Sequence, residues 1–259
     1  MTIPSVLVLD SGIGGLSITW EIRTRCPLLH IDYIADLEAF PYGIKPEEQI
    51  VARVAKLAEY AVTTLKPSII VIACNTASTV ALTAVRQLTA IPVVGVVPAI
   101  KPAAQLSKSG VIGVLATEGT INRRYTHNLI QEFAQNRTVA LHGSARLVAL
   151  AEQKLQGKSV SLQAVERELL PLLEKSPDMD TVVLACTHFP LLKEEFVRCF
   201  PQIRFWVDSG EAIANRVESL LSMQGSIVSA SSPASVNSFY VTSAQSSYPQ
   251  SSLERYLGA

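Results

Sequence analysis

The sequence has no excess of charge of either sign, no long hydrophobic run and few cysteines. Among 259 residues, 22 Lys and Arg face 22 Asp and Glu, and no run of basic residues exceeds two. This balance excludes the basic patch on which nucleic-acid binding usually depends. The longest apolar runs, such as 91–100, contain prolines and are too short to span a bilayer. No basic and apolar leader precedes Asp10, so we expect neither secretion nor membrane insertion.

Four cysteines are too few and too widely spaced for a zinc site or a disulfide framework. The sequence contains no C-x-x-C pair and no histidine cluster, so we expect no bound metal. We expect free thiols and a cytoplasmic location. A nucleotide is not expected either, because Gly12, Gly14 and Gly15 lack the G-x-G-x-x-G spacing and no P-loop lysine follows. These glycines favour a turn whose backbone approaches a small anionic ligand.

Hydrophobic residues make up 48% of the chain and charged residues 17%, which is ample material for a large core. Short runs rich in Val, Ile and Leu alternate with stretches of helical periodicity. Runs that are apolar at every position are typical of parallel strands covered on both faces. We therefore predict an α/β, doubly wound fold. The expected strands are 6–9, 31–35, 69–73, 93–97, 111–115, 139–142, 182–185 and 205–207, and the expected helices are 46–66, 77–88, 122–135, 145–155, 162–175, 191–200 and 211–223.

A weak internal repeat divides the chain into two similar halves. Strand ends at 10, 74 and 97 correspond to strand ends at 117, 186 and 208, at offsets of 107, 112 and 111 residues. We therefore predict two similar doubly wound lobes with mainly parallel sheets, one of residues 1–97 and 208–259 and the other of 98–207. Ligands of open α/β sheets bind beyond the carboxyl ends of the strands, so we expect the active site in the cleft between the lobes.

The segment 222–252 is rich in serine. We expect it to form a surface loop that returns to the sheet as an edge strand at 238–242. A helical turn is expected at 253–257.

Two cysteines occupy matching positions at the ends of predicted strands. Cys74 is followed by Asn75 and Thr76, and Cys186 is followed by Thr187 and His188. A single buried cysteine is most simply a core residue. A helix N-terminus or a histidine nearby, however, stabilises a thiolate, and two such cysteines indicate a functional pair. Cys26 and Cys199 lack such neighbours and are expected to be structural.

Other residues are candidates for the site because of their position in the sequence and not because of their residue type alone. Asp10 ends the first strand, where its carboxylate either exchanges a proton with a cysteine or caps the next helix. Tyr42 and Gly43 lie in a turn that offers a hydroxyl and a backbone amide to a pocket. Glu152 lies in a predicted helix, and by its local pattern alone it is a solvated surface acid.

Together these segments resemble the glutamate racemases, a family of cofactor-independent enzymes that supply D-glutamate for peptidoglycan. The resemblance extends over nearly the whole chain and implies two similar α/β lobes. It is carried by VLDSGIGGLS at 8–17, FPYG at 40–43, ACNTAS at 73–78, GVVPAIKPA at 95–103 and ACTHFPLL at 185–192.

The resemblance implies a two-base mechanism, in which one base acts on each face of the substrate Cα. Cys74 would take the proton from D-glutamate and Cys186 would take it from L-glutamate. Asp10 would assist Cys74, whereas Glu152 and His188 would assist Cys186. No cofactor is implied. The substrate-binding positions implied by the family pattern are Asp10, Ser11, Tyr42, Gly43, Asn75, Thr76, Thr187 and His188, with Thr117 as a weaker candidate.

One segment departs from the common family pattern. Many members have Cys-Pro ahead of the helix that carries the auxiliary acid, whereas this chain has GSARLVALAE at 143–152. The segment is similar to that of the proteobacterial branch, in which Glu152 keeps its assigned role. That branch includes enzymes activated by the peptidoglycan precursor UDP-N-acetylmuramoyl-L-alanine, so this precursor is an expected activator.

Three other functions are consistent with parts of the pattern. An aspartate racemase of the same superfamily is the nearest, although His188 and the turn at 40–43 favour glutamate. A two-lobed amino-acid binding protein would not need two reactive thiols. A cysteine hydrolase would need one cysteine and an oriented histidine, which leaves Cys74 unexplained. The oligomeric state is open, and a homodimer is one of the states considered.

Overall fold

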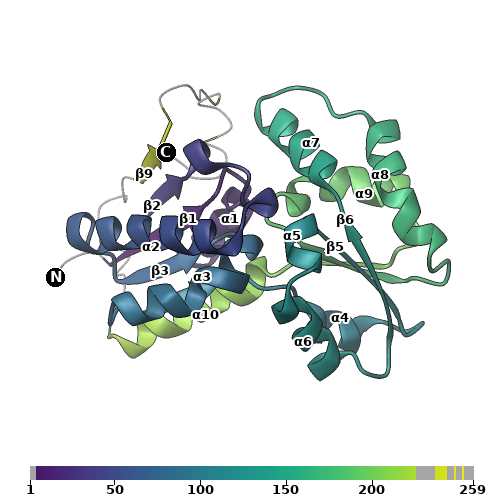
Figure 1. Ribbon diagram of the computed structural model, residues 1–259, viewed down its shortest axis with the longest axis horizontal. Helices are drawn as coiled ribbons and strands as arrows, with labels where there is room; N and C mark the ends of the chain where they lie inside the picture. The colour runs from purple at the N-terminus through teal and green to yellow at the C-terminus, as the bar shows by residue number, and fades with distance from the viewer. Residues whose placement is uncertain (1–3, 226–236, 244–247, 249–252, 254–259) are drawn as a thin grey trace. The chain divides into compact units, whose positions relative to one another are not determined.

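The computed structural model describes residues 4–225, 237–243, 248 and 253, and the chain divides into two compact units (Figure 1). Unit 1 comprises Met1–Val96 and Gly210–Ala259, and unit 2 comprises Val97–Ser209. The boundaries expected from the sequence lie within two residues of these. Among the described residues, no helix is both long and apolar enough to cross a membrane.

Unit 1 is built on a five-stranded sheet in the order β4-β3-β1-β2-β9, in which every neighbouring pair is parallel. The α/β class with mainly parallel sheets is thereby confirmed. Its strands are β1 (Ser5–Asp10), β2 (His30–Ala35), β3 (Ile69–Ile72), β4 (Val93–Gly95) and β9 (Ser238–Val241). Its helices are α1 (Leu16–Arg25), α2 (Glu47–Thr64), α3 (Asn75–Leu88) and α10 (Gly210–Met223), with short 3-10 turns η1 (Leu37–Ala39) and η2 (Tyr42–Ile44).

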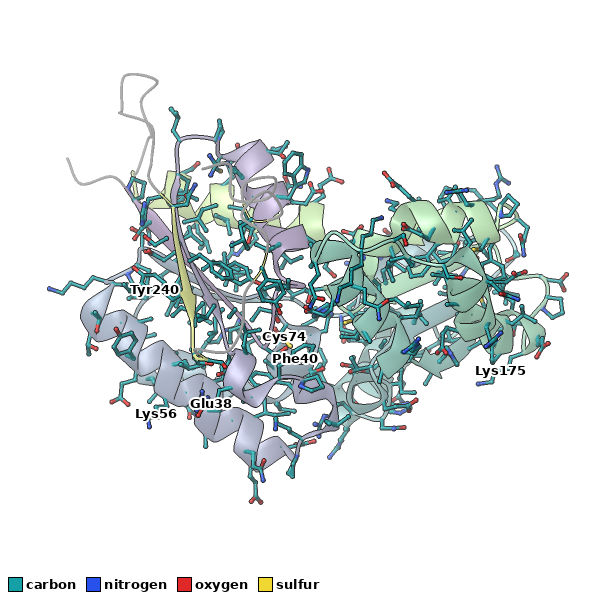
Figure 2. The ribbon with its side chains drawn as sticks, turned by 90° about the horizontal axis from the view of Figure 1, so that it is seen from above. Glu38, Phe40, Lys56, Cys74, Lys175 and Tyr240 are labelled. Carbon is teal, nitrogen blue, oxygen red and sulfur yellow. The ribbon has the colours of Figure 1, made fainter. Side chains whose placement is uncertain are left out.

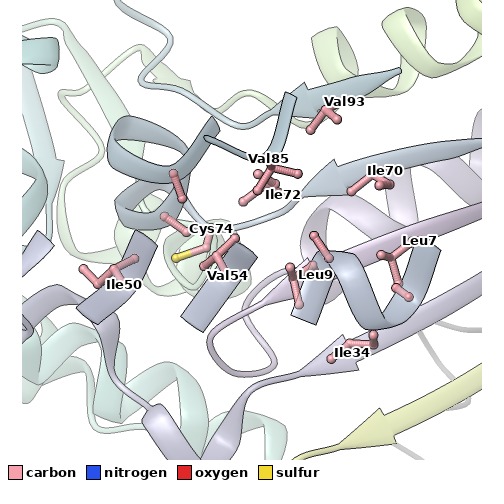
Figure 3. Packing of buried hydrophobic residues seen from close by; sticks show 14 of the residues in the cluster. Leu7, Leu9, Ile34, Ile50, Val54, Ile70, Ile72, Cys74, Val85 and Val93 are labelled. Carbon is pink, nitrogen blue, oxygen red and sulfur yellow. The ribbon is translucent and has the colours of Figure 1, made fainter. Parts of the chain in front are cut away.

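The core of unit 1 that lies beside Cys74 is formed by one face of the sheet and by helices α2 and α3. Helix α2 follows Pro46, has two acidic residues in its first turn, and buries residues three or four positions apart. Figure 3 shows Leu7 and Leu9 of β1 in the same cluster as Ile50 and Val54 of α2 and Cys74. Helix α1 packs against α10 on the other face of the sheet. The connection from β1 through α1 to β2 runs across the sheet in one direction, and the connection from β2 through α2 to β3 runs in the opposite direction. Because both crossovers are right-handed, α1 and α2 lie on opposite faces.

Unit 2 has a four-stranded parallel sheet in the order β6-β5-β7-β8. Helices α4 and α6 cover one face, and α7, α8 and α9 cover the other (Figure 1). Its strands are β5 (Val111–Ala116), β6 (Thr138–Gly143), β7 (Thr181–Ala185) and β8 (Phe205–Val207). Its helices are α4 (Ile100–Leu106), α5 (Glu118–Ile121), α6 (Arg124–Phe133), α7 (Ala145–Leu155), α8 (Leu162–Glu174) and α9 (Lys193–Cys199), with a 3-10 turn η3 (Phe189–Leu192).

The internal repeat is visible in the strand order. The series β2-β1-β3-β4 in unit 1 has the same order as β6-β5-β7-β8 in unit 2. With Cys74 matched to Cys186, the pairing registers match Asp10 to Ala116, an offset of 106 residues. The expected match of Asp10 to Thr117 is therefore wrong by one residue. The registers of β4 and β8 give an offset of 113, so the match of 97 to 208 is wrong by two.

Several helices differ from the sequence-based expectation. Helices α1 and α4 and the single turn α5 were not expected, because glycines, β-branched residues and Pro102 weaken their helical pattern. Helix α3 begins at Asn75, two residues earlier than expected. The helix expected at 191–200 is divided into η3 and α9. Strand β9 lies at the sheet edge as expected. Most of the serine-rich loop and residues 254–257 of the expected turn lie outside the described residues.

Candidate active site

Cys74 lies directly after β3 and directly before α3, at the carboxyl edge of the unit 1 sheet. Its side chain is buried, and its backbone is extended before the helix begins at Asn75. The adjacent strand β1 ends at Asp10, so parallel pairing brings the two strand ends to the same edge. Ser11 continues from β1 towards the cysteine, and its Oγ lies 3.7 Å from Cys74 Sγ.

The Asp10 carboxylate is held by a tight loop of its own chain. Its Oδ1 accepts the backbone N–H of Ser11 at 2.8 Å, and its Oδ2 accepts that of Gly15 at 2.7 Å. Tyr33 Oη lies 3.3 Å from the same Oδ2 and 3.1 Å from the carbonyl oxygen of Gly12. A Cβ on Gly15 would lie 2.9 Å from the Cβ of Ala73, so the close approach requires glycine. Asp10 therefore does not occupy the N-cap of α1, which is Gly15.

Asn75 carries a buried polar atom without a partner in the described structure. Its side chain is 3% exposed, and its Nδ2 makes no hydrogen bond. A buried donor left in this state costs about 1–3 kcal/mol, which a ligand with an acceptor oxygen would recover. Thr76 is buried beside it, in the first turn of α3.

The turn that contains Tyr42 and Gly43 lies against α3, and Tyr42 shares a hydrophobic cluster with Cys74. Tyr42 is almost fully buried, and its Oη donates a hydrogen bond to Asp36 Oδ2 at 2.5 Å. Burial and the adjacent Asp36 carboxylate raise the pKa of Tyr42, so its hydroxyl keeps its proton. Figure 2 shows Phe40, at the start of this turn, in the same region as Cys74.

Cys186 follows β7 at the equivalent edge of the unit 2 sheet, but its neighbours differ from those of Cys74. It enters a turn in which the Phe189 N–H donates to the Cys186 carbonyl at 3.0 Å. His188 Nδ1 lies 3.9 Å from Cys186 Sγ, and His188 Nε2 lies 2.7 Å from Glu152 Oε1. Glu152 belongs to α7 and is 8% exposed, so the expectation of a solvated surface acid from its local pattern is wrong.

His188 lies between Cys186 and Glu152, and these two neighbours determine its protonation state. Burial alone would lower the pKa of His188, but hydrogen bonds with Cys186 and Glu152 and their negative charge raise it well above the ordinary value. With Glu152 as acceptor at Nε2, Nδ1 is the nitrogen directed at the thiol. His188 is therefore able to stabilise a thiolate or to exchange a proton with it.

The remaining predicted residues have less specific surroundings. Thr187 is buried next to Cys186. Thr117 is half-buried and caps the short helix α5 by accepting the N–H of Thr120 at 3.2 Å. All four cysteines are free thiols, and Cys26 and Cys199 are more exposed than the other two. No group of three His, Cys, Asp or Glu side chains suited to a metal occurs within the described residues.

Two residues of the Cys74 region were not identified from the sequence. Tyr33 lies in the middle of β2 and contacts the Asp10 loop, whereas Asp36 follows β2 and binds Tyr42. Tyr33 is a buried residue of a strand whose sequence is typical of a core. The one available signal concerned Asp36, which directly follows the carboxyl end of a strand adjacent to β1.

Each unit thus presents a buried thiol with polar neighbours at the carboxyl edge of a parallel sheet. This arrangement places a candidate acid–base group at the ligand-binding edge of each sheet of an α/β protein. The model of the Asp/Glu/Hydantoin racemase family matches residues 18–217. The chain belongs to this family.

Relatives of the chain are similar to it over most of their length. A glutamate racemase of Pasteurella multocida is 52% identical over 219 residues, which is 85% of this chain and 81% of that protein. The crystal structure of Escherichia coli glutamate racemase, in complex with L-glutamate and the activator UDP-MurNAc-Ala, has a TM-score of 0.90 at 46% identity and covers 98% of this chain and 96% of that one. The glutamate racemase of Francisella tularensis, in complex with D-glutamate, has a TM-score of 0.79 at 26% identity and covers 99% and 94%.

The raised pKa of His188 predicts a pH-dependent contribution to stability. A group whose pKa rises on folding stabilises the protein below its unfolded pKa, about 6.5 for histidine, and loses this contribution as pH rises through the folded value. We expect His188→Gln to lower the free energy of unfolding by about 2 kcal/mol at pH 6, the scale of a hydrogen bond to a charged group. The difference should shrink as pH is raised in denaturant titrations. A difference that grows with pH would contradict the assignment of a charged His188.

Proposed function

We propose that this protein interconverts L- and D-glutamate without a cofactor and thereby supplies D-glutamate for peptidoglycan. Membership of the racemase family and the 52% identity to a glutamate racemase support this activity. The observation that carries the proposal is the presence of a cysteine with polar neighbours at equivalent strand ends of both sheets. Racemisation requires one proton acceptor and one proton donor on opposite faces of Cα, and two such thiols meet this requirement.

In the proposed reaction the thiolate of one cysteine takes the Cα proton, and the bonding electrons move into the α-carboxylate. The thiol of the other cysteine then delivers its proton to the opposite face, so that the product has the inverted configuration. Cys74 is the base for D-glutamate and Cys186 is the base for L-glutamate. After L-glutamate is converted to D-glutamate, Cys186 holds the abstracted proton and Cys74 is a thiolate. A further turnover in the same direction therefore requires Cys186 to release a proton to solvent and Cys74 to take one up.

The carbanion must be stabilised by hydrogen bonds, because its charge develops on the substrate carboxylate. We assign the unpartnered Nδ2 of Asn75 to a carboxylate oxygen of the substrate. Ser11, Tyr42, Gly43, Thr76 and Thr187 are proposed as further binding residues. Asp10 is proposed as the proton partner of Cys74, and the pair of His188 and Glu152 as that of Cys186.

A cysteine hydrolase is the alternative that one observation favours. The series Cys186, His188 and Glu152 has the order of nucleophile, base and orienting acid. In such an enzyme Cys74 would be dispensable, so its substitution separates the two functions.

We also propose a cytoplasmic location, because two thiols that act as bases must remain reduced.

Activation by a peptidoglycan precursor is an extension of the proposal. It is supported by the TM-score of 0.90 to the Escherichia coli enzyme, whose structure contains UDP-MurNAc-Ala as activator. We expect this compound to raise the rate of racemisation when it is added to the purified protein. A circular-dichroism assay with and without it measures the effect, with UDP alone as the control. An unchanged rate at saturating concentration would limit the proposal to unregulated racemisation.

The substitution of either active thiol should abolish racemisation. We expect Cys74→Ala and Cys186→Ala each to lower kcat by about 10²–10⁴-fold, the usual contribution of a general base. Cys26→Ser is the matched control and should retain activity, because that thiol lies outside the proposed site. Loss of optical activity of each enantiomer and exchange of Cα–H in deuterated water measure the result. Near wild-type racemisation by either alanine variant would refute the two-base proposal.

The two proton partners should be separable by direction. Asp10→Asn should slow proton abstraction by Cys74, and His188→Asn should slow abstraction by Cys186. Because the equilibrium constant between enantiomers is one, primary deuterium isotope effects must be measured separately for each direction. We expect a larger isotope effect with D-glutamate in Asp10→Asn and with L-glutamate in His188→Asn. Equal changes in both directions would show that the partners do not act on separate thiols.

A further inference from the structure

Asp36 is a fully buried carboxylate with an unusually complete set of donors. It follows β2, and its side chain is 0% exposed. Its Oδ2 accepts hydrogen bonds from Tyr42 Oη at 2.5 Å and from Arg53 Nε at 2.9 Å. Its Oδ1 accepts hydrogen bonds from a terminal nitrogen of Arg53 and from Thr242 Oγ1, both at 2.7 Å. Such a carboxylate fixes the groups that surround it, because each donor would be costly to leave unpaired.

The donors come from three separate parts of the chain. Tyr42 belongs to η2, Arg53 belongs to α2, and Thr242 follows the C-terminal strand β9. Thr242 is also held by its backbone, since its N–H donates to the Ala35 carbonyl at 3.2 Å. Figure 2 shows Glu38 close to the end of β9 and in front of α2.

Glu38 closes the network on its outer side. Its backbone N–H donates to Thr242 Oγ1 at 3.1 Å, and its carboxylate accepts a terminal nitrogen of Arg53 at 2.6 Å. The Thr242 hydroxyl is therefore both an acceptor and a donor, and it connects the loop after β2 with the end of β9.

The charges of this network keep the tyrosine neutral and the aspartate ionised. Burial would raise the pKa of Asp36, but the hydrogen bonds from Arg53, Tyr42 and Thr242 outweigh it and lower the pKa. The pKa of Tyr42 is raised by burial and by Asp36. Tyr42 therefore keeps its phenolic proton and donates it in a hydrogen bond to Asp36, and this hydrogen bond fixes the position of the Tyr42 ring.

We propose that Asp36 and Thr242 are positioning residues, which hold the turn of Tyr42 and Gly43 in its substrate-binding conformation and thereby make the C-terminal strand β9 a part of the glutamate site. This inference rests on the proposed racemase function. The turn packs in the cluster that contains Cys74, so a displaced Tyr42 alters the space beside that thiol. Neither Asp36 nor Thr242 is proposed to touch the substrate.

The test uses Thr242, since its side chain can be changed with little effect on the backbone. Thr242→Val has nearly the same shape but lacks the hydroxyl that Asp36 accepts. We expect KM for both enantiomers to rise about three- to tenfold, the scale of one ordinary hydrogen bond, because Asp36 keeps its other three donors and the effect on the substrate is indirect, and we expect kcat to stay within about twofold. Thr242→Ser keeps the hydroxyl and should restore the wild-type KM. Thr63→Val, at an exposed threonine of α2 whose hydroxyl bonds only to its own helix, is the control and should leave KM unchanged.

Two further measurements separate positioning from general loss of structure. Protection of the thiols from alkylation by glutamate gives an affinity that does not depend on turnover, and it should weaken in parallel with KM. Combining Thr242→Val with Tyr42→Phe should give less than the sum of the single effects, because both act through Asp36. Thermal unfolding confirms that each variant is folded at the assay temperature.

An unchanged KM in folded Thr242→Val, additive effects in the double variant, or an equal loss in Thr63→Val would overturn the positioning role while leaving racemisation intact. Failure of the wild-type protein to racemise glutamate would overturn both proposals.

Discussion

Parallel pairing is the constraint on which both sites depend. Every neighbouring pair of strands in the described part of the chain is parallel, so the carboxyl ends of each sheet lie along one edge. Both faces of the sheets are covered, and the strand interiors are therefore apolar. Few polar side chains lie within the strands, Asp32 of β2 being a buried exception, whereas several lie at the strand ends, where Asp10, Cys74 and Cys186 are found. The candidate functional groups are therefore concentrated at these edges.

The two sites use the same strand ends but obtain their charges differently. In unit 1 the acid is Asp10, which belongs to the strand end itself and is held by backbone N–H groups of its own loop. In unit 2 the equivalent position is Ala116, and the acid is Glu152, supplied by helix α7 through His188. A carboxylate near one thiol and a cationic histidine near the other give the two cysteines different electrostatic surroundings. Two units with the same strand order thus place two cysteines at equivalent strand ends but in different electrostatic surroundings.

The sequence was sufficient for features that depend on local pattern. The strands, the α/β class and the positions of both cysteines follow from apolar runs and the residues that end them. Helix α1 was not recognised, because its pattern is weak and its stability comes from packing against α10, a segment nearly 200 residues away. The burial of Glu152 could not be read from α7 alone, since it depends on a histidine 36 positions along the chain. The role of Asp36 depends on Thr242, which is more distant still.

The hydrogen-bond state of the buried polar groups near Cys74 distinguishes structural residues from those available to a ligand. The Asp36 carboxylate accepts four hydrogen bonds from this chain, so it has a structural role and is not available to a ligand. Asn75 is also buried, but its Nδ2 has no hydrogen-bond partner in the described structure. The free-energy cost of removing this donor from water is therefore not compensated within the folded chain. A carboxylate bound at this point would satisfy the amide and place the substrate beside the adjacent Cys74. The bound carboxylate would thus compensate a buried donor that the protein itself leaves unpaired, while the hydrogen bonds to Asp36 hold the neighbouring turn in place.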